Sequence, residues 1–171
     1  MLRRVIHWKL GRVEAELGES VDYLRHVVDV SVPAFLKFTK ILPFAAYRKR
    51  LPADAANVAR IVASRDEDCG TCVQIAINVA KSEGVPDEVL QAVIERAPDR
   101  LDDGLADVYA FGEAVVGQTG EEGPIRERLT ARYGEEGVIE LAYALASARI
   151  FPVVKRALGY ATSCKAVTWR V

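Results

Sequence analysis

The stretch that decides the fold covers residues 68–89 and reads DCGTCVQIAINVAKSEGVPDEV. It opens on a C-x-x-C motif, Cys69 to Cys72, and continues as an apolar run with the spacing of a buried helix. Gly84 ends this run and Pro86 opens the next segment, a pattern typical of one helix stopping and another starting. Two thiols one helical turn apart can form a disulfide and be reduced again, so the motif makes thiol redox chemistry the first hypothesis.

Apolar residues recur at helical rather than strand spacing along the chain. The sequence therefore predicts an all-α fold. The expected helices cover, in chain order, 2–17, a segment capped by Ser20 and running through Val28, a segment opened by Pro33 and reaching Leu42, 53–64, 72–80, 86–97, 105–116, 124–133, 136–150 and 152 to about 165. Segments 59–65 and 142–149 resemble each other, which aligns Asn57 with Glu140 and indicates two related helical halves, although alanine-rich helices look alike in general.

The composition is that of a globular chain. Basic and acidic residues number 23 and 24 among 171, and half of all residues are hydrophobic. This balance fits one domain and excludes a disordered or polyanion-binding protein, so we expect no nucleic-acid partner. A domain of this size buries roughly 70% of its unfolded surface, which makes neither a metal nor a disulfide necessary for folding.

No targeting segment stands out. Charge interrupts the N-terminus before an apolar run develops, and no stretch approaches the roughly 20 apolar residues of a membrane helix. We therefore expect a cytoplasmic protein without a membrane partner. In a reducing compartment, a C-x-x-C is more often catalytic or metal-binding than a permanent disulfide. A zinc site needs about four ligands, and a single C-x-x-C without a nearby histidine does not supply them, so we expect no metal and no cofactor.

Opposing charges surround the motif. With Asp68 as N-cap, Cys69 takes the first helical position and meets the partial positive charge of a helix N-terminus, which lowers the pKa of a thiol. Asp66, Glu67 and Asp68 raise that pKa, because a negative charge disfavours another anion nearby. The sequence leaves open which effect is larger. Since the helix is apolar nearly all round, we expect Cys72 to be less exposed than Cys69.

This combination of a C-x-x-C, a buried helix, a glycine stop and an acidic helix start resembles the core of the carboxymuconolactone decarboxylase family, in particular its alkyl hydroperoxidase D-like members. The resemblance is best over 51–97 and extends more loosely over 133–164. It implies an all-α multi-helix bundle over residues 51–171, with residues 1–50 as an added N-terminal helical arm of the same domain. It also implies a homo-oligomer, a trimer or hexamer, and a thiol pair that reduces a small peroxide or exchanges disulfides with a protein partner.

By the same resemblance, Cys72 matches the thiol that the family's proton relay activates, and Cys69 matches the thiol that resolves it into a disulfide. The relay itself is missing, because its histidine falls on Ala76 and its glutamate falls approximately on Asn57. A reactive Cys72 therefore needs a base from elsewhere in the chain.

Three residues are candidates for that base. Glu67 reaches the thiols if the turn before the helix folds back, and is otherwise a solvated charge at the helix start. Glu140 is either a buried carboxylate with a raised pKa or part of an ion pair at the surface or in an interface. His26 has a side chain suited to proton transfer near neutrality if the arm folds over the site, and is otherwise an ordinary surface histidine.

The sequence thus predicts a thiol oxidoreductase that uses Cys69 and Cys72, with Glu67 or Glu140 as the leading candidate base. Two alternatives stay open. One is a helical oligomer without redox turnover, in which the thiol pair is a structural or sensing remnant and the function is binding. The other is a lactone lyase or isomerase, as in other branches of the family. Cys164 is a third thiol, available for an intermolecular bridge or for core packing.

Overall fold

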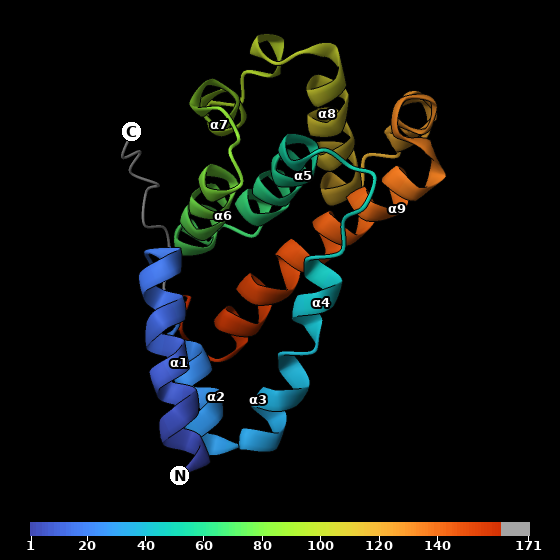
Figure 1. The fold of residues 1–171 in the computed structure, drawn as a ribbon. Coiled ribbons are helices and arrows are strands. Elements are labelled where there is room, and N and C mark those ends of the chain that lie inside the picture. Colours follow the sequence, from blue (N-terminus) through green and yellow to red (C-terminus); the bar gives the residue numbers. More distant parts are fainter. Residues whose placement is uncertain (162–171) are drawn as a thin grey trace.

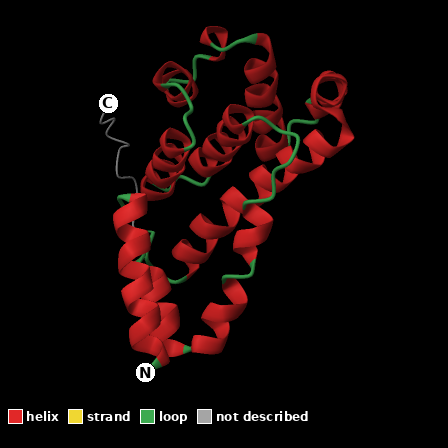
Figure 2. Cartoon of the chain, viewed as in Figure 1, coloured by secondary structure: helices red, strands yellow, loops and turns green. Residues whose placement is uncertain are grey.

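The computed structural model describes residues 1–161, and within this range every element of regular structure is a helix (Figure 2). The all-α prediction is confirmed. The elements in chain order are α1 (Leu2–Leu17), α2 (Asp22–Val30), α3 (Val32–Phe38), α4 (Ile41–Ala45), α5 (Ala53–Asp66), α6 (Gly70–Ser82), α7 (Asp87–Ile94), the short 3₁₀ helix η1 (Pro98–Arg100), α8 (Asp103–Gly117) and α9 (Glu122–Ala157). The alkyl hydroperoxidase D-like arrangement stays a proposal, and Cys164 lies outside the described residues.

The α5 helix lies at the centre of the molecule, in contact with α6, α8 and α9 (Figure 1). Its sequence is rich in alanine, and the small buried side chains of Ala55, Ala59 and Ala63 let neighbouring helices approach closely. On α8, Gly112 serves the same purpose, because a Cβ there would lie 3.0 Å from the side chain of Val62. Around α5 forms a large hydrophobic cluster, to which α7 and α9 add the fully buried side chains of Leu90, Leu129 and Leu141.

A second, smaller hydrophobic cluster joins the helices of the N-terminal arm. It contains side chains of α1, α2, α3 and the residue before α2: Ile6, Leu10, Val21, Tyr23, Val28 and Phe35. The C-terminal half of α9 runs along this arm (Figure 1), because Val154 packs against the small cluster and the ring of Phe151 meets Phe38 edge-on, 5.7 Å between centroids. The α9 helix therefore joins the two clusters. The expected boundary between arm and core near residue 51 stays a prediction.

The arm is divided differently from the sequence prediction. The segment opened by Pro33 ends at Phe38, and Pro43 lies in the first turn of a separate helix, α4. A proline is tolerated there because the first N–H groups of a helix have no partner within it. Ser20 is not the N-cap of α2, because Val21 takes that position and Asp22 is the first helical residue. The hydroxyl of Ser20 nevertheless accepts a hydrogen bond from the backbone N–H of Asp22.

Two of the three C-terminal segments expected from the sequence, 136–150 and the one that begins at 152, are continuous within α9, which ends at Ala157, whereas the segment 124–133 is separated from them by a kink. Gly134 leaves the helical conformation (φ 74°, ψ 172°) and forms this kink, so the predicted break between 124–133 and 136–150 is confirmed, whereas Pro152 lies inside the helix that follows. By length and composition alone, α9 is apolar enough to cross a membrane, so the expectation that no stretch approaches this limit is wrong. A helix that fills a protein core meets the same criteria, and Leu141 and Leu145 of α9 belong to the large cluster.

Candidate functional site

The C-x-x-C motif lies at the turn between α5 and α6. The α5 helix ends at Asp66, Asp68 takes a left-handed conformation with φ 48°, and Cys69 is the N-cap of α6. The expectation that Asp68 is the N-cap is therefore wrong by one residue. Aspartate tolerates the left-handed conformation better than most residues, so the chain reverses at Asp68 and the helix begins at Gly70.

The two thiols face each other in a buried site. Their Sγ atoms lie 2.7 Å apart, in hydrogen-bond contact, and both cysteines are free. Cys69 is 5% exposed and Cys72 is 9% exposed, so the expectation that Cys72 is the less exposed of the two is wrong. The arm contributes to the covering of the motif. The buried Tyr23 of α2 lies close to it: burial is the main cause that raises the pKa of this phenol, and electrostatic coupling to the two cysteines adds to the rise.

The surroundings shift the pKa values of the two thiols in opposite directions. The hydrogen bond with the Cys72 thiol is the largest cause that lowers the pKa of Cys69, to about 6. Burial opposes this shift, while the Cys72 N–H and the positive charges of Lys155 and Arg156 support it. The same hydrogen bond, burial and the Cys69 charge raise the pKa of Cys72. The thiolate at neutral pH is therefore Cys69, whereas the family resemblance gives the activated thiol as Cys72.

Glu67 is held on the α9 side of the turn. Its buried carboxylate accepts a hydrogen bond from Arg149 Nε at 2.7 Å and pairs with Arg156 at 3.9 Å. The backbone carbonyl of Glu67 accepts a further hydrogen bond from Arg156. Glu67 is therefore not a solvated charge at the helix start, and its carboxylate contacts guanidinium groups of α9 instead of a thiol.

Glu140 is buried, but its pKa is lowered rather than raised, which corrects the prediction. Burial alone raises the pKa of this carboxyl, and the N–H groups of Leu51, Lys49 and Arg50, with the charge of Arg48, outweigh that effect. These three N–H groups donate to the carboxylate at 2.8, 2.8 and 3.0 Å respectively. Glu140 therefore anchors the link between α4 and α5 to α9 as an anion. A carboxylate held in this way does not serve as a base at the thiols.

Asn57 and Ala76, at the two positions of the missing relay, make structural contacts instead. Asn57 is fully buried, and its amide donates to the carbonyl of Ala53 and to the carboxylate of Glu83. The amide oxygen of Asn57 accepts from Arg60. Ala76 packs against the large cluster. These side chains hold α5 and the end of α6 together.

The histidines lie elsewhere in the arm. The ring of His26 lies against the ring of Tyr160, 5.7 Å between centroids, and His7 Nε2 contacts the carboxylate of Asp29 at 2.8 Å. Across residues 1–161, no group of three or more His, Cys, Asp or Glu side chains is placed to hold a metal ion. In the described part of the chain, the site is a thiolate and a thiol without a neighbouring imidazole.

The site thus has the thiol pair of the family resemblance without its relay. No protein-family model, curated protein or solved structure matches this chain. The resemblance to alkyl hydroperoxidase D-like proteins rests on the C-x-x-C and its helical surroundings, and it stays a proposal.

The structure adds residues that the sequence did not indicate. Lys155 and Arg156 come from the last turn of α9, and their positive charges lower the pKa of Cys69. Tyr23 comes from α2, and the nearby cysteines contribute to its raised pKa. Lys155 is only 9% exposed, which is rare for lysine. No sequence signal marks these residues, because they are ordinary members of helices far from the motif in the chain. Only the packing of α2 and α9 near the start of α6 brings them to the site.

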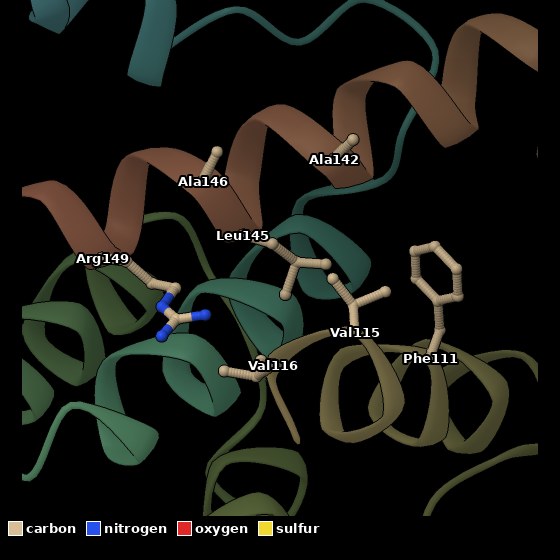
Figure 3. Close-up of a pocket in the computed structure, with 7 residues that line it drawn as sticks. All are labelled: Phe111, Val115, Val116, Ala142, Leu145, Ala146 and Arg149. Carbon is tan, nitrogen blue, oxygen red and sulfur yellow. The ribbon is translucent and has the colours of Figure 1, made fainter. Parts of the chain in front are cut away.

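A cleft of about 290 Å³ opens between α8 and α9 (Figure 3). Its lining is apolar except for one guanidinium: Phe111, Val115, Val116, Ala142, Leu145, Ala146 and Arg149. Arg149 Nε also donates to Glu67, which is close to Cys69 in the chain. One side chain therefore joins this cleft to the turn that carries the thiols.

Proposed function

We propose that this protein is a thiol-dependent oxidoreductase that reduces a small peroxide through Cys69 and Cys72. The observation that carries the proposal is the pair of sulfur atoms 2.7 Å apart, one favoured as a thiolate and the other as a thiol. A thiolate is the nucleophile in peroxide reduction, and a neighbouring thiol resolves the oxidised sulfur. This supports an alkyl hydroperoxidase D-like function in which the two cysteines exchange the roles that the resemblance gives them.

The reaction balances in two steps. The Cys69 thiolate attacks one oxygen of the peroxide, the O–O bond breaks, and the sulfur is oxidised to a sulfenic acid while the leaving alkoxide takes up a proton from solvent. The Cys72 thiol then attacks the Cys69 sulfur, an S–S bond forms, and the sulfenic oxygen leaves as water with the Cys72 proton. A small dithiol donor reduces the resulting disulfide by thiol–disulfide exchange and restores the pair.

Burial favours a small peroxide over a protein disulfide as the substrate. Both cysteines are at most 9% exposed, and Tyr23 of the arm lies beside them. A protein disulfide must bring its own sulfur into line with the attacking sulfur, which needs an open surface around the thiol. A peroxide such as hydrogen peroxide or a small alkyl hydroperoxide needs only a narrow path.

We also propose that the chain assembles as a homo-oligomer in a reducing compartment such as the cytoplasm. Large apolar side chains remain exposed on α8 and α9: Val115, Ile139 and Tyr143. A trimer or hexamer that covers them lowers the free energy by removing apolar surface from water. A reducing compartment keeps Cys69 and Cys72 as free thiols, the state in which they can react.

The second candidate function is binding without turnover. The observation that favours it is the absence of a proton-accepting side chain at the thiols within residues 1–161, since Glu67 and Glu140 are bound to other groups. No observation favours the lactone lyase or isomerase over these two.

The test is peroxide-dependent oxidation of dithiothreitol by the reduced protein, with hydrogen peroxide and tert-butyl hydroperoxide as substrates. We expect turnover in the wild type and none in Cys69→Ser. In the absence of dithiothreitol, pre-reduced Cys72→Ser should consume one peroxide per chain and stop, with a sulfenic acid at Cys69 that dimedone traps. Wild-type protein without turnover, but with an unchanged oligomer and melting temperature in the Cys69→Ser/Cys72→Ser variant, would support the binding function instead.

A further inference from the structure

The outward face of α1 combines exposed apolar side chains with cations. Leu2, Val5 and Trp8 are 57%, 47% and 62% exposed. At about 100° per residue, the exposed Arg4 and Arg12 lie one turn before and one turn after Trp8 on the same face. The guanidinium of Arg12 lies over the Trp8 ring, 5.4 Å from its centroid. Apolar and basic groups therefore share one surface.

The opposite face of α1 is the one that packs on the protein. Ile6 and Leu10 both lie about 160° from Trp8 around the helix axis, and they are buried in the small cluster. The helix thus has its core contacts on one side and further large apolar side chains on the side that faces solvent. Such side chains exposed together are typical of an interaction surface.

This surface continues at the end of α2. His7 Nε2 contacts the carboxylate of Asp29 at 2.8 Å, so the last turn of α2 lies beside the first turns of α1. Val30, the residue after Asp29, is 69% exposed. In Figure 1 this end of the arm is the part of the molecule farthest from α7 and α8. We call the combined surface the arm face, and it consists of Leu2, Arg4, Val5, Trp8, Arg12 and Val30.

The arm and the rest of the chain have opposite net charge. Residues 1–50 contain 10 basic and 5 acidic residues, whereas residues 51–171 contain 13 and 19. Residues 1–13 contain four cations and no acidic residue. Among the acidic side chains nearest to them, Asp29 contacts His7 and Glu14 pairs with Arg25. An anionic surface therefore attracts the arm and repels the remainder, which turns the arm face toward it.

A phospholipid bilayer with anionic headgroups matches both properties of the arm face. Tryptophan favours the level of the headgroups, arginine pairs with phosphates, and aliphatic side chains enter the boundary of the acyl chains. A nucleic acid is also anionic, but its contacts with a protein are dominated by its phosphates, which would leave Leu2, Val5 and Val30 in water. The mixture of apolar and basic side chains favours the bilayer.

We infer that the arm face docks this protein on the surface of a membrane that contains anionic phospholipids. The α1 helix then lies along the membrane surface and does not cross it. The expectation of no membrane partner rested on the search for a spanning segment, and a helix that lies in the interface needs none. The cytoplasmic leaflet carries anionic lipids, so docking is compatible with the proposed reducing compartment. The inference goes beyond the proposed function and does not depend on the thiols.

The first test is sedimentation with vesicles of phosphatidylcholine and phosphatidylserine in a molar ratio of about 7:3. Wild-type protein should bind them, and should bind vesicles of phosphatidylcholine alone at least tenfold more weakly. Arg4→Glu changes the charge of the arm face by two and should weaken binding more than tenfold. Arg126→Glu is the matched control, the same change at an exposed arginine of α9 outside the arm, and should bind as the wild type. No binding by the wild type, or an equal loss in both variants, overturns the inference.

The second test concerns the apolar side chains, in variants whose helical circular dichroism matches the wild type. Trp8→Ala should weaken binding to the mixed vesicles more than tenfold, and Val5→Ala severalfold. Val153→Ala, at a valine of α9 that is 50% exposed, is the matched control for Val5→Ala and should have no effect. Unchanged binding in Trp8→Ala and Val5→Ala contradicts insertion of the arm face.

Tryptophan fluorescence identifies the group that enters the membrane. The emission should shift to shorter wavelength when mixed vesicles are added, and this shift should be absent in Trp8→Phe, which keeps Trp169 as its one tryptophan. A shift that persists in Trp8→Phe counts against the inference. If the wild type binds a DNA duplex but neither kind of vesicle, or if Trp8→Ala dissociates an oligomer that ignores vesicles, the arm face holds another partner and the inference is overturned.

Discussion

Cys69 and Cys72 carry the same side chain, and their places at the start of α6 separate their chemistry. Cys69 is the N-cap, where backbone N–H groups of the first turn lack helical partners, and the cations at the end of α9 lie nearby. Cys72 lies one turn inside the helix, and the hydrogen bond between the two sulfur atoms lowers the pKa of Cys69 while it raises that of Cys72. Each thiol therefore fixes the protonation state of the other.

The pH dependence of Cys69 alkylation follows from this arrangement. Because the pKa of Cys69 is lowered to about 6, the thiolate dominates at pH 7 and the rate falls as the pH drops through 6. Cys72→Ala removes the largest cause of this shift, so the midpoint should rise toward the ordinary thiol value of about 8.5. Cys72→Ser, whose hydroxyl still donates a hydrogen bond, should move it less. A wild-type midpoint near 8.5 contradicts the assignment of the thiolate.

Glu140→Gln tests the anion that ties the link between α4 and α5 to α9. We expect a loss of about 2 kcal/mol in the free energy of unfolding at pH 7, because the hydrogen bonds from Lys49, Arg50 and Leu51 lose a charged acceptor. Glu136→Gln is the matched control, since its carboxylate lies on the same helix and pairs with Arg50 in solvent, where such a pair contributes little. Equal losses in the two variants, measured by urea unfolding, contradict this account.

The contribution of Glu140 to stability should depend on pH. The lowered pKa of Glu140 means that its stabilisation is present above the pKa of an unfolded glutamate, about 4.3, and is lost as the pH falls toward and below that value. The stability difference between wild type and Glu140→Gln should therefore shrink between pH 5 and pH 3. Urea unfolding across this range measures the difference, and a difference that grows as the pH falls contradicts a lowered pKa for Glu140.

At the scale of whole helices, α9 is kinked at a residue that is not helical (Figure 1). Gly134 has φ 74° and ψ 172°, a region open almost only to glycine, and nothing lies within 4 Å of a Cβ built there. Gly134→Ala should therefore cost roughly 2 kcal/mol through backbone strain alone, without a steric clash. Gly123→Ala, in the same helix with equally open surroundings and no positive φ, should cost nothing. Thermal unfolding compares them, and equal melting temperatures count against the strain.

Helix boundaries show which part of the fold the sequence could predict. The bounds 2–17 of α1 are as expected, since an amphipathic pattern ends there at Gly18 in the left-handed conformation. Gly84 also ends its helix, and Gly134 ends the helical stretch before the kink in α9. A glycine shows where a positive φ is allowed, but the direction that the next helix takes depends on tertiary packing. Leu129 and Leu141, on either side of Gly134, both lie in the large cluster, so both parts of α9 pack on the same core.

The sequence could likewise predict only part of the candidate site. The C-x-x-C motif identified both thiols, because their spacing is a property of the local chain. The sequence could not rank their pKa values, since Lys155 and Arg156 reach the site from the far end of α9. Nor could it show that Glu140 is an anion bound by backbone N–H groups, because those groups belong to a link distant in the chain.

At the scale of the whole molecule, the thiol pair lies near the meeting point of the two hydrophobic clusters. The start of α6 belongs to the core, while Tyr23 belongs to the small cluster of the arm, and Val154 of α9 packs against that cluster. The arm is further tied to α6 by the amide of Asn78, which donates to the carbonyl of Leu17 at 2.7 Å. Access to the thiols therefore depends on how firmly the arm is packed.

Val28→Ala tests this dependence. Val28 is fully buried in the small cluster, and its truncation should weaken the arm by about 2 kcal/mol. If the arm opens separately from the core, such a loss raises the open population more than tenfold, and the alkylation rate of both thiols at pH 7 rises with it. The midpoint of the Cys69 pH profile should stay unchanged, because no charged group is altered.

Val30→Ala is the matched control, the same substitution in the same helix at a side chain that is 69% exposed, and it should leave the alkylation rate as in the wild type. Hydrogen exchange followed by mass spectrometry separates local from global opening. Amides of α1 and α2 should lose protection in Val28→Ala, while those of α5 and α8 keep theirs, because the latter helices are packed in the large cluster. Equal alkylation rates in the two variants would mean that the arm does not control entry to the thiols, and that a peroxide reaches them by another path.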